Sequence, residues 1–194
     1  MAKVNRDEIL EAAVRLFNQN GYHATSMQDI ARAINIKKPS LYHHFDSKEA
    51  ILLAILQTGM NRLIEKVEAI VHSDQDCASK LRAAIHAHAE TIASHLEGAA
   101  VFLREDRGLG DGYMQQYVSM RDHFERLFRT IVQQGIERGE FRNVDVAITV
   151  HGLLGMVNWM TRWYRPEGRL SAAQIADLFA NLFLEGLQNR PADT

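Results

Sequence analysis

The sequence predicts an all-α protein, with a small three-helix N-terminal unit followed by a larger helical bundle. Apolar residues recur at spacings of three and four over most of the 194 residues. Capping and helix-ending residues stand where each such run begins and stops, and no alternating run of useful length predicts a β-strand. Apolar residues make up 46% of the chain, which excludes a disordered or fibrous protein.

Cysteine usage and the longest apolar run predict a cytoplasmic protein. The single cysteine, Cys77, cannot form an intramolecular disulfide, and no apolar run after a basic start resembles a secretion signal. The longest apolar stretch, residues 144–157, contains Asp145 and His151 and is shorter than the roughly 20 residues that a membrane span needs. We therefore expect no membrane integration.

The first predicted helix covers residues 6–20. Asn5 and Glu8 have the spacing of a capping box, and Gly21 ends the apolar pattern. A second, two-turn helix follows, capped by Thr25 or Ser26 with an acidic or amide side chain reaching back. Its apolar side consists of Met27, Ile30, Ala31 and Ile34.

A third short helix follows a tight turn. Asn35 can adopt the left-handed conformation that ends the second helix. Pro39 then suits a first helical turn, where its missing N–H is not needed. Leu41 and Phe45 form the inward side of this third helix.

The rest of the chain predicts six further helices. Asp46, Ser47 and Glu49 begin a helix that continues for about six turns to Val71, long enough to link two domains. Helices are then expected at about 77–95, 99–107 and 111–138, the last ending at Gly139. Asp145 caps a helix to Tyr164, and Ser171 with Gln174 forms a capping box for a final helix to Leu187.

The third helix has the features of the second helix of a helix-turn-helix unit. Ser40, Tyr42, His43 and His44 can point outward while the apolar side packs inward. Residues 32–45 carry three basic side chains, two histidines and no acid, so positive charge and free N–H groups face the same way. These features favour DNA binding, although a solvated surface has the same composition.

Residues 25–33 (TSMQDIARA) and 40–53 (SLYHHFDSKEAILL) resemble the DNA-binding unit of TetR-family transcriptional regulators. The resemblance covers about residues 6–53. It implies a two-fold dimer on a double-stranded operator, and it places a set of residues at or near the DNA, most of them on phosphates: Thr25, Ser26, Lys38, Ser40, Tyr42, His43 and Lys48.

Two residues depart from the family pattern. The family usually has glycine where Asn35 stands and a small hydroxyl residue where Lys37 stands. Asparagine can adopt the left-handed turn, but lysine cannot cap a helix. We therefore expect Lys37 to contribute a phosphate or base contact, and no operator sequence can be carried over by analogy.

Several C-terminal segments resemble a branch of the family that contains acyl-CoA-responsive repressors. They are residues 100–109, 121–122, 135–142, 152–159 and 162–171. The resemblance implies an acyl-CoA effector and no bound cofactor. Trp159, Arg162 and Trp163 lie within one helical turn and offer aromatic faces and a guanidinium, to which the effector site would add Phe102, Arg104 and Arg107. The alternative is that the tryptophans pack between helices and the arginines pair with carboxylates.

Other chemistry is sparse. His86 and His88 lie on different faces of a helix and no third ligand has helical spacing to either, so no metal site is predicted. Residues 108–112 are glycine-rich but follow a helix, which does not fit a dinucleotide fingerprint. Cys77 has no nearby histidine that would make it a nucleophile. We expect no enzyme activity.

The residues and the resemblance together predict a ligand-responsive repressor. Residues 1–47 would form the DNA-binding domain, and residues 48–194 the effector-binding and dimerisation domain. The last two helices would form the homodimer interface through Leu153, Leu154, Val157, Ile175, Leu178, Phe179, Leu182, Phe183 and Leu187. Two alternatives are a regulator of another hydrophobic molecule, such as a drug or lipid, and a helical acyl-CoA carrier or enzyme.

Overall fold

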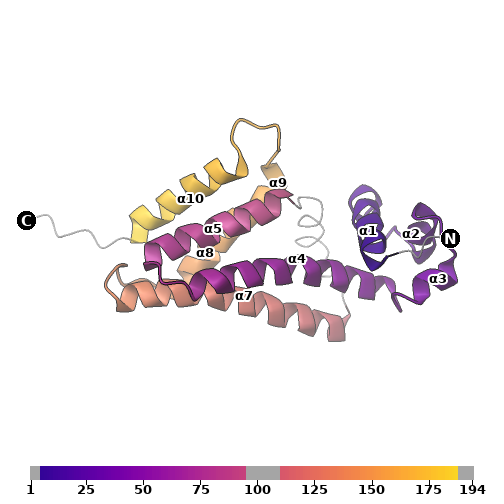
Figure 1. Ribbon diagram of the computed structural model, residues 1–194, viewed down its shortest axis with the longest axis horizontal. Coiled ribbons are helices and arrows are strands. Elements are labelled where there is room, and N and C mark those ends of the chain that lie inside the picture. Colours follow the sequence, from indigo (N-terminus) through magenta and orange to yellow (C-terminus); the bar gives the residue numbers. More distant parts are fainter. Residues whose placement is uncertain (1–4, 95–109, 188–194) are drawn as a thin grey trace, which may run out of the picture. The chain divides into compact units, whose positions relative to one another are not determined.

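The computed structural model describes residues 5–94 and 110–187, and this part of the chain is helical with no β-strand (Figure 1). The prediction of an all-α fold is confirmed. None of the described helices combines the length and apolar character needed to cross a membrane. The helices are α1 (Arg6–Asn20), α2 (Met27–Ala33), α3 (Lys38–Tyr42), α4 (Lys48–Val71), α5 (Cys77–Ser94), α7 (Asp111–Glu137), α8 (Val146–Asn158), α9 (Met160–Trp163) and α10 (Ala172–Leu187).

Side-chain caps set the first two helix boundaries as predicted. The Asn5 side chain accepts from the backbone of α1, and the Glu8 carboxylate accepts from the Asn5 N–H. Ser26 forms a second capping box with Asp29. Between α2 and α3, Asn35 has φ +54°, the left-handed conformation that lets the chain turn sharply.

The described residues form two compact units. The first contains residues 5–60 and 110–120, so the first half of α4 and the start of α7 pack with α1–α3. This unit extends beyond the predicted boundary at residue 47. Its core consists of apolar side chains from these five helices and their connections, including Ile9, Phe17, Ile30, Leu41, Phe45, Leu52 and Tyr117.

The second unit contains residues 61–94 and 121–187. In it α5 lies along α10 and also contacts α8 and α9 (Figure 1). Gly135 is needed here for close packing, because a Cβ at this position would lie 2.2 Å from the Phe141 ring. Gly139 has φ +73° and turns the chain back so that Phe141 becomes buried.

The helix predicted between Asp145 and Tyr164 is divided, which corrects the sequence interpretation. Asp145 caps α8 as expected, but α8 ends at Asn158 and the single turn α9 begins at Met160. The Thr161 hydroxyl donates to the Asn158 carbonyl at 2.9 Å, and a hydroxyl bonded to the preceding turn competes with regular backbone bonding. The helix predicted at 99–107 lies outside the described residues.

Candidate DNA-binding, effector and dimer sites

The outer face of α3 is polar and basic. Lys37, Lys38, Ser40 and His43 are exposed, and the Tyr42 side chain is 42% exposed. The Lys38 ammonium lies 5.7 Å from the centre of the Tyr42 ring. Because Leu41 on the opposite face is fully buried, α3 is fixed with these side chains pointing outward. Lys37 makes no side-chain cap, as predicted, so its charge remains at the start of α3.

Thr25, which the resemblance places at or near the DNA, has a structural role within its unit. The residue is 1% exposed. Its hydroxyl lies 2.9 Å from the carbonyl oxygen of Gly21 and 3.3 Å from that of Leu16. A hydroxyl has a single proton to donate, and both neighbouring acceptors lie inside the unit. The side chain therefore holds the α1–α2 turn rather than facing DNA.

Ser26 is exposed, but its hydroxyl is already engaged as the cap of α2. It lies 2.6 Å from an Asp29 carboxylate oxygen and accepts from the Asp29 N–H. Hydrogen bonds from Ser26 lower the pKa of Asp29 below its usual value, so the carboxylate stays ionised. The Ser26 hydroxyl is thus used within α2, and its contact with DNA stays a prediction.

Lys48 fixes the α1–α2 connection from the first residue of α4. Its ammonium donates to the carbonyl oxygens of Tyr22 at 2.7 Å and Thr25 at 2.8 Å, and lies 4.3 Å from the Tyr22 ring centre. Nearly all its donor capacity is therefore directed at the backbone. Lys48 therefore has a positioning role, and its direct phosphate contact stays a prediction.

The predicted effector residues fall into two groups. Phe102, Arg104 and Arg107 lie outside the described residues. Trp159 and Trp163 are on the surface where α8 meets α9, 63% and 43% exposed, and the Arg162 guanidinium lies 5.9 Å from the Trp159 ring centre. The structure brings Trp159 and Arg162 together, but on an exposed surface.

The second unit also contains a buried histidine, His88, for which the sequence predicted no role beyond the rejected metal site. His88 is 4% exposed, packs edge-on against Phe124 at 5.2 Å between ring centres, and hydrogen-bonds to Asn158. Its Nδ1 has no partner among the described residues. Burial lowers the pKa of His88 to about 4, so the ring is neutral near pH 7.

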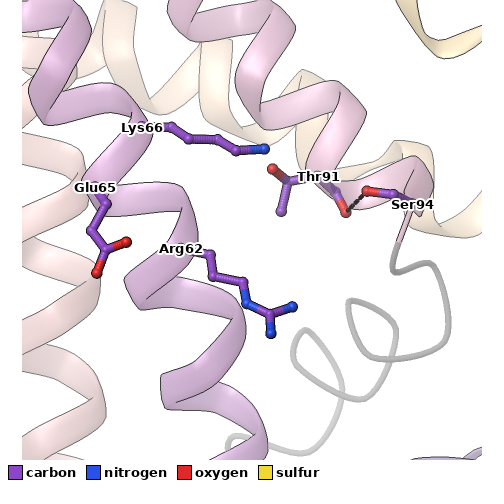
Figure 2. A pocket seen from close by; sticks show the side chains of 5 residues that line it. All are labelled: Arg62, Glu65, Lys66, Thr91 and Ser94. Carbon is purple, nitrogen blue, oxygen red and sulfur yellow. Dashed lines mark hydrogen bonds between the residues drawn. The ribbon is translucent and has the colours of Figure 1, made fainter.

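A pocket of about 330 Å³ lies between α4 and α5 of this unit, and its lining includes Arg62, Glu65, Lys66, Thr91 and Ser94 (Figure 2). The Arg62 and Lys66 side chains extend from α4 toward Thr91 and Ser94 on α5, whereas Glu65 points away from them. The sequence analysis missed this pair. Arg62 and Lys66 are four residues apart, which places both side chains on one face of the helix, and this spacing could have been recognised in the sequence.

An apolar face runs along α8 and α10. Ile148, Leu178 and Leu182 are exposed, and a second pocket of about 330 Å³ is lined by residues of both helices, including Gly152 and Phe183. The structure corrects part of the predicted dimer interface, because four of its members pack inside the monomer: Leu153, Val157, Ile175 and Leu187.

No group of three or more histidine, cysteine, aspartate or glutamate side chains within residues 5–94 and 110–187 could hold a metal ion. Cys77 is buried, which raises the pKa of its thiol, opposite to what a nucleophile needs.

Family models match both units. Residues 9–55 match the model of bacterial regulatory proteins of the tetR family, and residues 74–187 match a tetracyclin repressor-like C-terminal domain. The chain belongs to the TetR family of transcriptional regulators. It is therefore a helix-turn-helix regulator and not an enzyme.

Full-length relatives agree with this assignment. The TetR-family chain is 33% identical to the transcriptional repressor KstR2 of Rhodococcus jostii over 184 residues, covering 94% of this chain and 90% of the relative. It is 23% identical to the fatty acid metabolism regulator of Bacillus subtilis over 185 residues, covering 94% and 95%.

Solved structures show the same fold. The structure of PfmR from Thermus thermophilus has a TM-score of 0.86 at 37% identity, covering 93% of this chain and 99% of PfmR. A structure of AibR in complex with isovaleryl coenzyme A and operator DNA has a TM-score of 0.83 at 31% identity, covering 91% and 96%.

Proposed function

We propose that this TetR-family protein is a dimeric repressor that leaves its operator when an acyl-CoA ester binds the second unit. The observation that carries the DNA-binding part is the exposed face of α3, with Lys37, Lys38, Ser40, Tyr42 and His43 directed outward over a buried Leu41. A recognition helix presented in this way can enter a major groove and meet the flanking phosphates.

The dimer would form through the exposed face of α8 and α10. Ile148, Gly152 and Trp159 are exposed at helical spacing on or at the end of α8, and Leu178 and Leu182 are exposed on α10. Two copies of a helix pair with such faces form a four-helix bundle around a two-fold axis. This placement favours Trp159 as an interface residue over an effector contact.

The acyl-CoA effector is supported by the relatives and by the second unit's chemistry. KstR2 and the B. subtilis fatty acid metabolism regulator align over nearly the whole chain, and AibR was solved with isovaleryl coenzyme A. The second unit offers a basic pocket on α4 and an unpartnered buried Nδ1 on His88. Arg162 and Trp163 remain candidate contacts for the CoA moiety.

Helix α4 provides a route by which effector binding could change DNA affinity. Its first residue, Lys48, holds the α1–α2 connection, and Arg62 and Lys66 lie on the same helix. An effector that binds better to an arrangement unable to hold DNA shifts the population toward it. A useful shift needs a differential affinity of about 3–5 kcal/mol.

Two assays test this proposal in sequence. Immobilised protein is incubated at low salt with sheared genomic DNA from its source, and retained fragments are sequenced; we expect a nearly palindromic motif. A thermal-shift panel then compares aliphatic, aromatic and steroid-derived CoA esters with their free acids. Stabilisation by free acids or unrelated drugs alone would instead support a regulator of another hydrophobic molecule, and failure to retain DNA would support an acyl-CoA carrier.

A further inference from the structure

The pocket between α4 and α5 is lined by two basic side chains, Arg62 and Lys66. Some other arginines of the unit have carboxylate partners: Arg82 lies 3.5 Å from Asp177, and Arg121 lies 3.2 Å from Asp122. Arg62 and Lys66 have no such partner among the residues that the structure describes. Two neighbouring cations that form no ion pair, beside a Glu65 side chain that points away from them, favour an anionic ligand.

The pocket's hydroxyl groups limit which chemistry it can recognise. The Thr91 hydroxyl donates to the Ala87 carbonyl and the Ser94 hydroxyl to the Glu90 carbonyl, both at 2.6 Å. Their protons are therefore used within α5. The donors available to a ligand are those of Arg62 and Lys66, up to five and three N–H groups respectively. Such a pocket suits a ligand group that has several acceptor oxygens and no hydrogen-bond donors of its own.

We propose that Arg62 and Lys66 bind the phosphate groups of the coenzyme A moiety of the effector. This inference rests on the proposed acyl-CoA response. Arg62 and Lys66 are four residues apart, so their side chains leave one face of α4 about one turn apart, close enough to hold one phosphate or a diphosphate together. A pocket of about 330 Å³ is at the small end of ligand sites and fits a phosphate-bearing part rather than a whole acyl-CoA.

The turn of α5 that precedes Thr91 indicates where the rest of the ligand would lie. Thr91 lines the pocket, and His88 lies three residues before it on the same helix, buried beside Phe124. Phosphates bound at the charged pocket would leave the acyl end free to extend toward this apolar interior. Charge at the surface and apolar side chains within match the two ends of an acyl-CoA.

Isothermal titration calorimetry on the full chain tests this subsite. Coenzyme A, octanoyl-CoA and octanoate are titrated into the wild type, into Arg62→Gln/Lys66→Gln, and into Arg126→Gln/Arg169→Gln as a charge-matched control at exposed sites. We expect the first variant to bind both CoA probes at least tenfold more weakly with a reduced salt dependence, because two charged contacts are lost. The control should change affinity less than twofold, and octanoate should not discriminate between the three proteins.

Three results would overturn the subsite: undetectable coenzyme A binding to the wild type, equal binding by Arg62→Gln/Lys66→Gln, or an equal loss in both double variants. Failure of the proposed function looks different. If coenzyme A esters bind through Arg62 and Lys66 but do not release operator DNA, the subsite stands and the release mechanism is wrong.

Discussion

The ammonium group of Lys48 lies 2.8 Å from the carbonyl oxygen of Thr25. Lys48 begins α4, and Thr25 immediately precedes the cap of α2, so this bond joins α4 to the connection between the two helices that position α3. The Thr25 hydroxyl secures the same connection from inside through Gly21. We therefore expect DNA binding to depend on how Lys48 and Thr25 position α3.

Replacing Lys48 by methionine should destabilise the protein. Met keeps much of the apolar stem but leaves the carbonyls of Tyr22 and Thr25 without their charged donor, at an expected cost of about 1–3 kcal/mol in unfolding free energy. Urea denaturation measures this loss, and Lys66→Met, on an exposed part of the same helix, serves as the control. Equal stability of both variants would show that Lys48 has no positioning role.

Side chains on α3 should contribute directly to operator affinity. Lys38→Ala should weaken binding and reduce the slope of log affinity against log salt by about 1, because one phosphate contact is lost. Tyr42→Ala should weaken binding with a smaller change in slope. Fluorescence anisotropy with labelled operator measures both, with Arg126→Ala as the control. An unchanged salt slope in Lys38→Ala would remove this residue from the interface.

Charge on the exposed face of α10 should prevent dimerisation. Leu178→Glu with Leu182→Glu places carboxylates where the proposed interface would bury them, and burying unpaired charges costs several kcal/mol. Light scattering should then give the monomer mass. Ala173→Glu adds a charge to an exposed position opposite Leu182 on the helix and should leave the dimer intact. A dimer mass for the double variant would place the interface elsewhere.

His88 should make stability depend on pH. Its pKa falls from 6.5 to about 4 on folding, so protonation favours the unfolded chain. The folded state keeps its full stability above pH 6.5 and loses about 3 kcal/mol as the pH falls to 4. Urea midpoints across this range, compared with those of His88→Leu, isolate this contribution, and identical pH profiles would contradict it.

Local patterns predicted much of the fold. The caps at Asn5 and Ser26, the turn at Asn35 and the capping box at Ser171 all occur as expected, because each depends on residues within a few positions of one another. The break at Trp159 was missed. At this break the Thr161 hydroxyl donates to the Asn158 carbonyl, a local bond that the apolar periodicity of the segment does not indicate.

Site residues were harder to predict, because burial decides their roles. The family resemblance named Thr25 and Lys48, but tertiary contacts direct both side chains toward backbone carbonyls. Similarly, residues 135–142 resemble the acyl-CoA-responsive branch, yet their main contacts are structural. Gly135 admits the Phe141 ring, and the Glu140 carboxylate accepts from the Cys77 N–H at 2.7 Å. A sequence motif that this chain shares with the acyl-CoA-responsive branch can therefore reflect packing as well as ligand binding.

The central claim is that an acyl-CoA ester controls the affinity of the protein for DNA. One titration tests this claim most directly. Protein bound to its labelled operator is titrated with CoA esters of aliphatic, aromatic and steroid acids while anisotropy is followed. We predict that at least one ester returns the anisotropy to that of free DNA, whereas its free acid does not. Anisotropy that stays at the bound value for every ester, with each ester shown to remain intact, would contradict the account.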